Sequence, residues 1–349
     1  MMDYAGLDYR NIRFPVNRAL TDAERSSRYA QAHRGRATPM DFFSVVKFNA
    51  SHMELVDRWY SVKGFNTWLG GGVLTVSVGL IFAMYGALFF SGRTAPMNVV
   101  DWVGVVGLTP LFLCLAWAGW WLIRTECGRY THYPIRLDRK SRKVHFFRQN
   151  GTVLTVPWDT LFLTLGQSKS PLVGTTYDLR AHVLGEDGET VLESFSLGYT
   201  FPGNMESMDK FWAFLQPYME AEDGVERTHQ ELKQSLLMPV DGRREGWRWS
   251  IFRTFAPGLH YPWTMLLLCI PLGLNAVGRM LAMRTSKIPK WPEEVEQANP
   301  VETDDPYRLT WRDNGPLGWW ELYWPLLCTV IGVGAFVGVL GWVIAGLWR

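Results

Sequence analysis

The chain has 349 residues, of which 48% are hydrophobic and 19% charged, and its net charge is +2 at pH 7. So small a charge argues against a nucleic-acid-binding protein, which usually carries a strongly basic surface. The four cysteines form no Cys-x-x-Cys pair and indicate reduced thiols, neither a disulfide framework nor a metal site. Many of the 18 tryptophans lie at the ends of apolar runs, a placement typical of membrane–water interfaces.

Residues 1–64 form a polar, arginine-rich arm without the pattern of a secretory signal peptide. The motif Thr21-Asp22-Ala23-Glu24 matches a capping box and predicts a short helix that continues to Arg34. A second helix is predicted from Met53 to Val62. We interpret this segment as a cytoplasmic arm.

Two apolar runs follow, at residues 65–90 and 99–123. Each is longer than the roughly 20 residues that a helix needs to cross a bilayer. Because only a short polar turn separates them, residues 65–124 are expected to form an antiparallel transmembrane hairpin.

A second transmembrane hairpin is predicted at residues 261–349, after a basic connector at 226–260. Its apolar runs lie at 261–283, which Pro271 interrupts, and at 319–348. A polar loop at 284–318 joins them. The expected architecture therefore has four transmembrane helices.

Lysine and arginine residues set the orientation of a membrane protein. One basic set flanks the first hairpin on the side of the central domain: Arg58, Lys63, Arg124 and Arg129. Arg93 alone lies in the turn, so both termini and the central domain are expected in the bacterial cytoplasm. A second basic set disagrees, because it follows the third run on the expected outer side: Arg284, Lys287 and Lys290.

The central domain, residues 125–225, alternates apolar and polar residues as half-buried strands do. Asn150-Gly151 marks a tight hairpin between two of these strands. At its end the apolar spacing becomes helical, with one stripe of Met208, Phe211, Trp212, Leu215 and Met219. The expected fold class is thus α+β, a small antiparallel sheet or barrel closed by a C-terminal helix.

Small residues at four-residue spacing indicate close helix packing, within the bundle or between copies in a homo-oligomer. They are Gly79, Ala83 and Ala87 in the first run and Gly334 and Gly338 in the last. We expect contacts inside the monomer.

Asn275 and Arg279 lie one turn apart near the end of the third run. A charge within a membrane is a functional candidate by default. Arg279 also lies close enough to the interface to extend its head group into water. We favour this second interpretation, an anchor.

A basic cluster marks the turn between the first two strands of the central domain: Arg139, Lys140, Arg142 and Lys143. Beside a cytoplasmic leaflet it would attract anionic lipid, with about 1 kcal/mol for each basic residue. A solvated turn is the equal alternative.

Motifs of catalysis or cofactor binding are missing from the sequence. There is no GxSxG, GxGxxG or GxxxxGK[ST], and no pair of histidines at metal-binding spacing. We therefore expect no enzyme, no cofactor and no metal. A transporter would need paired intramembrane charges or repeated broken helices, and Pro110 and Pro271 supply only weak breaks.

The central block, with Tyr133-Pro134-Ile135-Arg136-Leu137-Asp138 and Val156-Pro157-Trp158-Asp159, resembles the pleckstrin-homology-like domains of bacterial membrane proteins. The whole chain is similar to a family of uncharacterised polytopic inner-membrane proteins of Gram-negative bacteria. Tyr9 to Arg18, Leu55 to Tyr60 and the central domain carry this resemblance.

Members of that family are encoded beside antibacterial effectors of type VI secretion systems. The resemblance implies an immunity or accessory protein that binds or neutralises a membrane-targeting toxin, with the cognate toxin and membrane lipids as partners. The alternative is a membrane-anchored scaffold whose cytoplasmic domain recruits a protein or anionic lipid.

Overall fold

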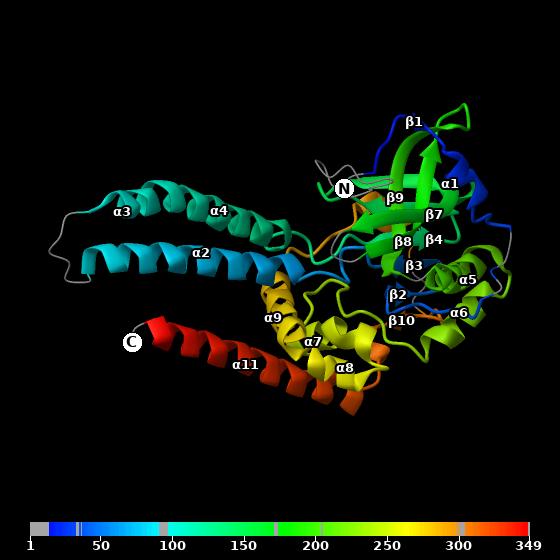
Figure 1. Cartoon of the computed structure of the whole chain (residues 1–349). Coiled ribbons are helices and arrows are strands. Elements are labelled where there is room, and N and C mark those ends of the chain that lie inside the picture. Colours follow the sequence, from blue (N-terminus) through cyan, green and yellow to red (C-terminus); the bar gives the residue numbers. More distant parts are fainter. Residues whose placement is uncertain are drawn as a thin grey trace. The chain divides into compact units, whose positions relative to one another are not determined.

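The computed structural model describes residues 14–32, 35, 37–90, 97–170, 174–203, 205–298, 300 and 304–347. The chain divides into two compact units (Figure 1). Unit 1 combines Met1–Ser61, Thr131–Arg244 and Ile288–Pro316. Unit 2 combines Val62–Tyr130, Glu245–Lys287 and Leu317–Arg349.

Unit 1 contains two antiparallel sheets. The larger has the order β10-β2-β3-β4-β5-β6. Its strands are β2 (Val45–Phe48), β3 (His52–Leu55), β4 (Ile135–Asp138), β5 (Lys143–Phe147), β6 (Val153–Pro157) and β10 (Leu309–Thr310). Because β3 pairs with β4, the first apolar hairpin is inserted in the chain between two neighbouring strands.

The smaller sheet has the order β1-β9-β8-β7. Its strands are β1 (Arg18–Ala19), β7 (Phe162–Ser170), β8 (Gly174–Leu184) and β9 (Thr190–Pro202). The strands expected from the alternation in the central domain are present as β4 to β9, as is the hairpin at Asn150-Gly151, where Gly151 has a φ of +88°. Two curled sheets that recruit distant strands differ, however, from the single small sheet or barrel expected, and the pleckstrin-homology-like closure is not confirmed.

Helix α5 (Glu206–Glu220) supplies the main apolar face of unit 1, and α6 (Gly224–Leu232) follows it. The predicted stripe is confirmed, because all five of its side chains are buried. Tyr218 contacts Phe48 of β2, and Trp212 stacks on Trp158 in the 3-10 turn η2 (Trp158–Thr160). Each buried side chain of this size contributes roughly 1.5–3 kcal/mol.

The N-terminal arm differs from its prediction. The capping box is confirmed, since Thr21 and Glu24 cap α1 (Asp22–Ser26), but this helix ends at Ser26 instead of Arg34. The helix expected from Met53 is wrong, because His52–Leu55 forms strand β3. The arm is part of the folded unit, so unit 1 is larger than residues 125–225.

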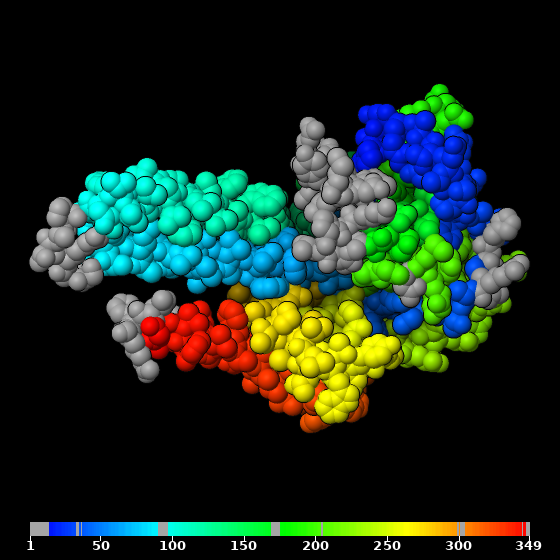
Figure 2. Space-filling view, viewed as in Figure 1, coloured from blue at the N-terminus to red at the C-terminus, as the bar shows by residue number. Residues whose placement is uncertain are grey.

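Unit 2 contains, within the described residues, three helices long and apolar enough to cross a membrane. The first span, Phe65–Phe89, lies in α2 (Phe65–Phe90). The second, Val99–Glu126, is made of α3 (Val99–Val103), η1 (Gly104–Leu108) and α4 (Thr109–Glu126). The third, Trp319–Val343, is made of η5 (Trp319–Tyr323) and most of α11 (Trp324–Leu347). Helices α2 and α4 pack along their lengths (Figure 2). The first hairpin is thus present, and four spans are not confirmed.

The third apolar run is broken. It forms α8 (Pro262–Leu267) and α9 (Cys269–Thr285), separated by Leu268, after α7 (Trp247–Phe255) and the short turn η3 (Ala256–Gly258). Within unit 2, α7, α8 and α9 gather at the end where α2 and α11 begin (Figure 1). Exposed aromatic and aliphatic side chains mark α8, among them Trp263 and Leu267.

Candidate functional site

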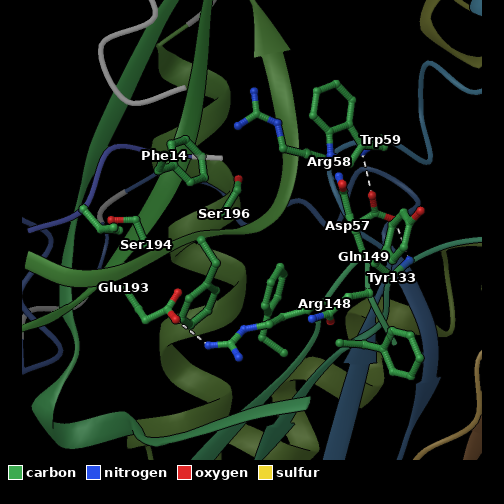
Figure 3. A pocket seen from close by; sticks show the side chains of 15 residues that line it. Phe14, Asp57, Arg58, Trp59, Tyr133, Arg148, Gln149, Glu193, Ser194 and Ser196 are labelled. Atoms are coloured by element: carbon green, nitrogen blue, oxygen red, sulfur yellow. Dashed lines mark hydrogen bonds and ion pairs between the residues drawn. The ribbon is translucent and has the colours of Figure 1, made fainter. Parts of the chain in front are cut away.

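A pocket of about 250 Å³ lies in unit 1 between β5 and β9 (Figure 3). Three parts of the chain meet there: the N-terminal arm, the turn after β3, and the central domain. The side chains that the site uses are Phe14, Asp57, Arg58, Trp59, Tyr133, Phe146, Arg148, Glu193 and Phe195.

Asp57 shapes the turn that carries Arg58 and Trp59 into the wall. Its Oδ2 accepts a hydrogen bond from the backbone N–H of Trp59 at 2.8 Å. Its Oδ1 accepts one from the backbone N–H of Tyr133 at 2.9 Å. Two charge-assisted hydrogen bonds of this kind hold a turn firmly. The carboxylate therefore ties the end of β3 to the segment before β4.

Phe14 and Arg58 form the inner wall of the pocket, and Arg180 contacts the same phenylalanine ring. The guanidinium carbon of Arg58 lies 5.3 Å from the centroid of the Phe14 ring, and that of Arg180 lies 4.6 Å from it. Both distances fit cation–π contacts. Behind them Asp178 is fully buried, and its Oδ1 accepts a hydrogen bond from Nη2 of Arg180 at 3.1 Å. Burial alone would raise the pKa of Asp178, but the charges of Arg180 and Arg58 lower it.

The mouth and floor of the pocket are simpler. At the mouth, Nη2 of Arg148 pairs with Oε1 of Glu193 at 2.5 Å, and both side chains are partly exposed. At the floor, the rings of Phe146 and Phe195 stack with centroids 4.9 Å apart. The cavity thus has apolar flat walls, a charged mouth and a buried arginine inside.

A serine, a histidine and a glutamate lie in a line at the edge of this site. Ser194 Oγ lies 2.6 Å from Nδ1 of His182, and Nε2 of His182 lies 3.2 Å from Oε1 of Glu24. Glu24 also accepts two hydrogen bonds from Arg18 and two from Thr21, so its carboxylate is committed to the cap of α1. Because His182 is fully buried, we infer that Ser194, His182 and Glu24 together attach the N-terminal arm to strand β8.

A second polar group crosses the larger sheet. The register aligns Lys47, Glu54, Arg136 and His145 on four neighbouring strands. Trp291 covers them: its Nε1 donates to Oε1 of Glu54 at 2.9 Å, and its ring lies 5.0 Å from the guanidinium carbon of Arg136. Burial alone would raise the pKa of Glu54, but the charges of Lys47 and Arg136 lower it to about 2.

Comparison with known proteins gives a family. Residues 112–303, more than half of the chain, match a family of unknown function, DUF6708. The chain belongs to this family. No curated protein and no solved structure matches it. The region matched to DUF6708 contains Tyr133, Arg148 and Glu193 of the pocket, whereas Phe14 and Arg58 precede it.

The basic cluster of this DUF6708 chain is divided between two environments. Arg139 donates to the carbonyl oxygens of Tyr218 and Ala221, and Arg142 donates to that of Met219 at 3.1 Å. These carbonyls end α5 and lack partners within the helix, so both arginines cap it. Lys140 and Lys143 are exposed. Lipid or partner contact by this cluster stays a prediction.

Arg279 is not the snorkelling anchor that we favoured. Its side chain and that of Glu245 are both fully buried, and two hydrogen bonds of 2.7 Å join them. Glu245 precedes α7 and therefore ties the end of the connector to α9. Asn275 is partly buried, and its Oδ1 has no hydrogen-bond partner among the described residues.

The predicted small residues do not make the close helix contacts inside this chain. Gly79, Ala83, Ala87, Gly334 and Gly338 are exposed, and a Cβ on any of the three glycines would meet nothing within 4 Å. The close approach uses Gly70 and Gly119 instead. A Cβ on Gly70 would lie 2.5 Å from the carbonyl oxygen of Gly119. The homo-oligomer alternative stays a prediction.

Proposed function

We propose that this chain is a non-enzymatic, membrane-anchored binding protein, and that it acts as an immunity protein against a membrane-targeting toxin of a type VI secretion system. The single observation that carries the binding role is the pocket of unit 1. Two stretches that carry the resemblance to effector-associated membrane proteins, Tyr9–Arg18 and Leu55–Tyr60, supply its Phe14, Asp57, Arg58 and Trp59. Residues 9–13 lie outside the described residues.

The toxin link rests on the resemblance, and the site suits a recognition role. Its residues hold one another through backbone contacts, aromatic stacking and ion pairs. Among the described residues no group of three or more histidine, cysteine or acidic side chains could hold a metal ion. A partner segment or small ligand that enters the pocket would be fixed by Arg58 and the rings around it.

The orientation that we propose has three spans and one re-entrant segment. The three parts of unit 1 fold together, so they lie on one side of the membrane. The chain between them, Glu245–Lys287, must then leave and return on that side. Helix α11 follows unit 1 and crosses once, so the C-terminus lies opposite to unit 1, not beside the N-terminus as expected.

Aromatic and basic residues support this orientation. Exposed tryptophans mark the end of unit 2 where α11 begins: Trp120, Trp121, Trp263, Trp319 and Trp320. Trp102 and Trp342 mark the opposite ends of their helices, as two interfacial belts would. Arg284, Lys287 and Lys290 now fall on the side of unit 1, so the earlier disagreement in the basic residues disappears. The positive-inside rule then places unit 1 in the cytoplasm, with the chain in the inner membrane.

The immunity role is tested by sister-cell competition. A strain that lacks the gene is attacked by its parent, and it carries a plasmid encoding the wild type, Arg58→Gln or Arg312→Gln. Arg312 is exposed on unit 1 outside the pocket. We expect wild type and Arg312→Gln to restore survival, and Arg58→Gln to fail at equal membrane abundance. A deletion strain as resistant as its parent contradicts the immunity role.

The orientation is tested with reporters fused after Leu347. Alkaline phosphatase, active only outside the cytoplasm, should be active there, whereas green fluorescent protein should be dark. The same reporters inserted after Pro300, inside the part of the chain assigned to unit 1, serve as the control and should behave in the opposite way. A fluorescent C-terminal fusion contradicts the three-span orientation.

A scaffold function is the second candidate, favoured by the exposed Lys140 and Lys143 beside the capped end of α5. Because β3 and β4 pair across the hairpin, the full chain is the appropriate sample, not residues 125–225. Reconstituted in nanodiscs, it should bind vesicles with 30% anionic lipid, and Lys140→Ala with Lys143→Ala should weaken binding. Lys233→Ala is the matched control. Unchanged binding removes the lipid version.

A further inference from the structure

Arg58 is the least satisfied cation in the pocket. Its side chain is 11% exposed, and its guanidinium lies against the rings of Phe14 and Trp59. Nη1 of Arg58 has no hydrogen-bond partner among the described residues. The nearest acid is Asp178, whose Oδ2 lies 3.9 Å from this Nη1, beyond hydrogen-bond distance.

Because Arg58 is largely buried, the missing hydrogen bond at its Nη1 costs free energy. A buried charged donor without its hydrogen bond loses solvation that nothing replaces. The pKa of Arg58 is lowered, first because burial disfavours the charged guanidinium, while Asp178 and Asp57 act in the opposite direction and Arg180 adds to the lowering. An anion beside Nη1 would offset this cost.

The acids already present do not meet that need. Both oxygens of Asp57 accept backbone hydrogen bonds. Oδ1 of Asp178 accepts from Arg180, and its Oδ2 approaches Nη1 of Arg58 only as an ion pair at 3.9 Å. Glu193 pairs with Arg148 at the mouth. Figure 3 shows Glu193 and Arg148 on the side of the pocket opposite to Arg58. The inner end can therefore take one more acceptor from a ligand.

The shape and charge of the pocket limit the ligand. Its volume of about 250 Å³ is below the roughly 300–1,000 Å³ of pockets for drug-sized molecules. Its walls are the flat rings of Phe14, Trp59, Tyr133 and Phe146. A planar carboxylate matches a guanidinium in two parallel hydrogen bonds. A phosphate dianion would instead meet Asp57 and Asp178 with only Arg58 and Arg180 against it.

We propose that this pocket binds the carboxylate of a small, flat or aromatic ligand group, with Arg58 as its charge partner. The inference rests on the proposal that the pocket is the binding site, and adds the chemistry of what it binds. The carboxylate belongs either to a free small acid or to the C-terminus of a protein partner.

The test compares an acid with its neutral isostere on the full chain in nanodiscs. Binding of 4-fluorobenzoate and 4-fluorobenzamide is followed by ¹⁹F NMR line broadening. Because a charge-assisted pair is about twice as strong as a neutral one, we expect the acid to bind roughly tenfold more tightly or better. Equal affinities of acid and amide overturn the inference, and this comparison needs no variant.

Variants then assign the effect to Arg58. Arg58→Gln should reduce binding of 4-fluorobenzoate roughly tenfold and leave 4-fluorobenzamide unchanged, while Arg58→Lys should retain part of it. Arg312→Gln, an exposed arginine of unit 1 outside the pocket, is the matched control and should bind as wild type. Wild-type binding of 4-fluorobenzoate by Arg58→Gln overturns the inference.

Two further comparisons identify the source of the carboxylate and test the carboxylate inference separately from the proposed function. Displacement of 4-fluorobenzoate by N-acetylphenylalanine more strongly than by benzoate assigns the carboxylate to a peptide C-terminus, and the reverse order assigns it to a free acid. If Arg58→Gln loses sister-cell protection although acid and amide bind alike, the carboxylate inference fails and the proposed function stands. If acid binding depends on Arg58 but Arg58→Gln still protects sister cells, the carboxylate inference stands and the role of the pocket in protection fails.

Discussion

The buried pair Arg279–Glu245 allows a quantitative prediction about unit 2. Both side chains are fully buried, and two parallel hydrogen bonds of 2.7 Å join the guanidinium to the carboxylate. Removing one partner leaves the other charge buried and unpaired. We expect Glu245→Leu or Arg279→Met each to lower the free energy of unfolding by about 3–5 kcal/mol.

The double variant separates the ion pair from simple packing. Arg279→Met combined with Glu245→Leu removes both charges and keeps apolar volume at the site. Because desolvation of the pair offsets much of its attraction, we expect the double variant to lie much closer to wild type than either single variant. The coupling energy of this cycle should therefore be several kcal/mol, well above the roughly 0.5 kcal/mol of independent sites.

Unfolding in detergent micelles, followed by circular dichroism across a denaturant series, supplies these free energies. Arg284→Met is the matched control, since Arg284 lies exposed on the same helix, and it should stay within about 0.5 kcal/mol of wild type. Single variants that cost less than about 1 kcal/mol, or a double variant that costs the sum of both, would refute the reasoning.

Two further predictions concern packing and pH. Gly70→Leu should separate α2 from α4 and lower the melting temperature, whereas Gly79→Leu should not, because a Cβ would meet backbone at Gly70 and nothing at Gly79. Equal melting temperatures by differential scanning fluorimetry contradict this. Burial lowers the pKa of His52 and of His145 to about 4. An unfolded histidine takes up its proton near pH 6.5, so stability should fall as the pH drops from about 6.5 to 4, by on the order of 3 kcal/mol for each. The double variant His52→Gln with His145→Gln should flatten this dependence of stability on pH, and His260→Gln should not. A wild-type stability that does not change over this pH range contradicts the prediction.

The strands of the central domain could be predicted because their signals are local. Alternation in Ile135–Asp138 and Lys143–Phe147, with Asn150-Gly151 after them, fixes strands and turn without distant contacts. Strands β2 and β3 were missed because they carry the partly buried Lys47 and the buried Glu54. Their burial depends on Trp291, more than 200 positions away, which no local pattern contains.

The pocket was missed for the same reason. Phe14, Arg58 and Glu193 come from three parts of the chain, and none belongs to a catalytic or metal-binding motif. The one available signal was the resemblance, since Tyr9–Arg18 and Leu55–Tyr60 carried it without an assigned role. Arg279 was predicted to be notable, but its partner Glu245 lies 34 positions earlier and outside the apolar run.

Trp291 supports the three-span orientation that we propose. Its indole donates to Glu54 of β3 and covers Arg136 of β4, so the chain after α9 packs on the sheet whose strands β3 and β4 flank the first hairpin. A sheet cannot have strands on both sides of a bilayer, because every backbone group in the hydrocarbon must be satisfied within a helix or closed barrel. In the orientation that we propose, the segment with Arg279 therefore enters and leaves on one face. Its buried charge is then tolerable at that face, where Glu245 can reach it from the connector without crossing hydrocarbon.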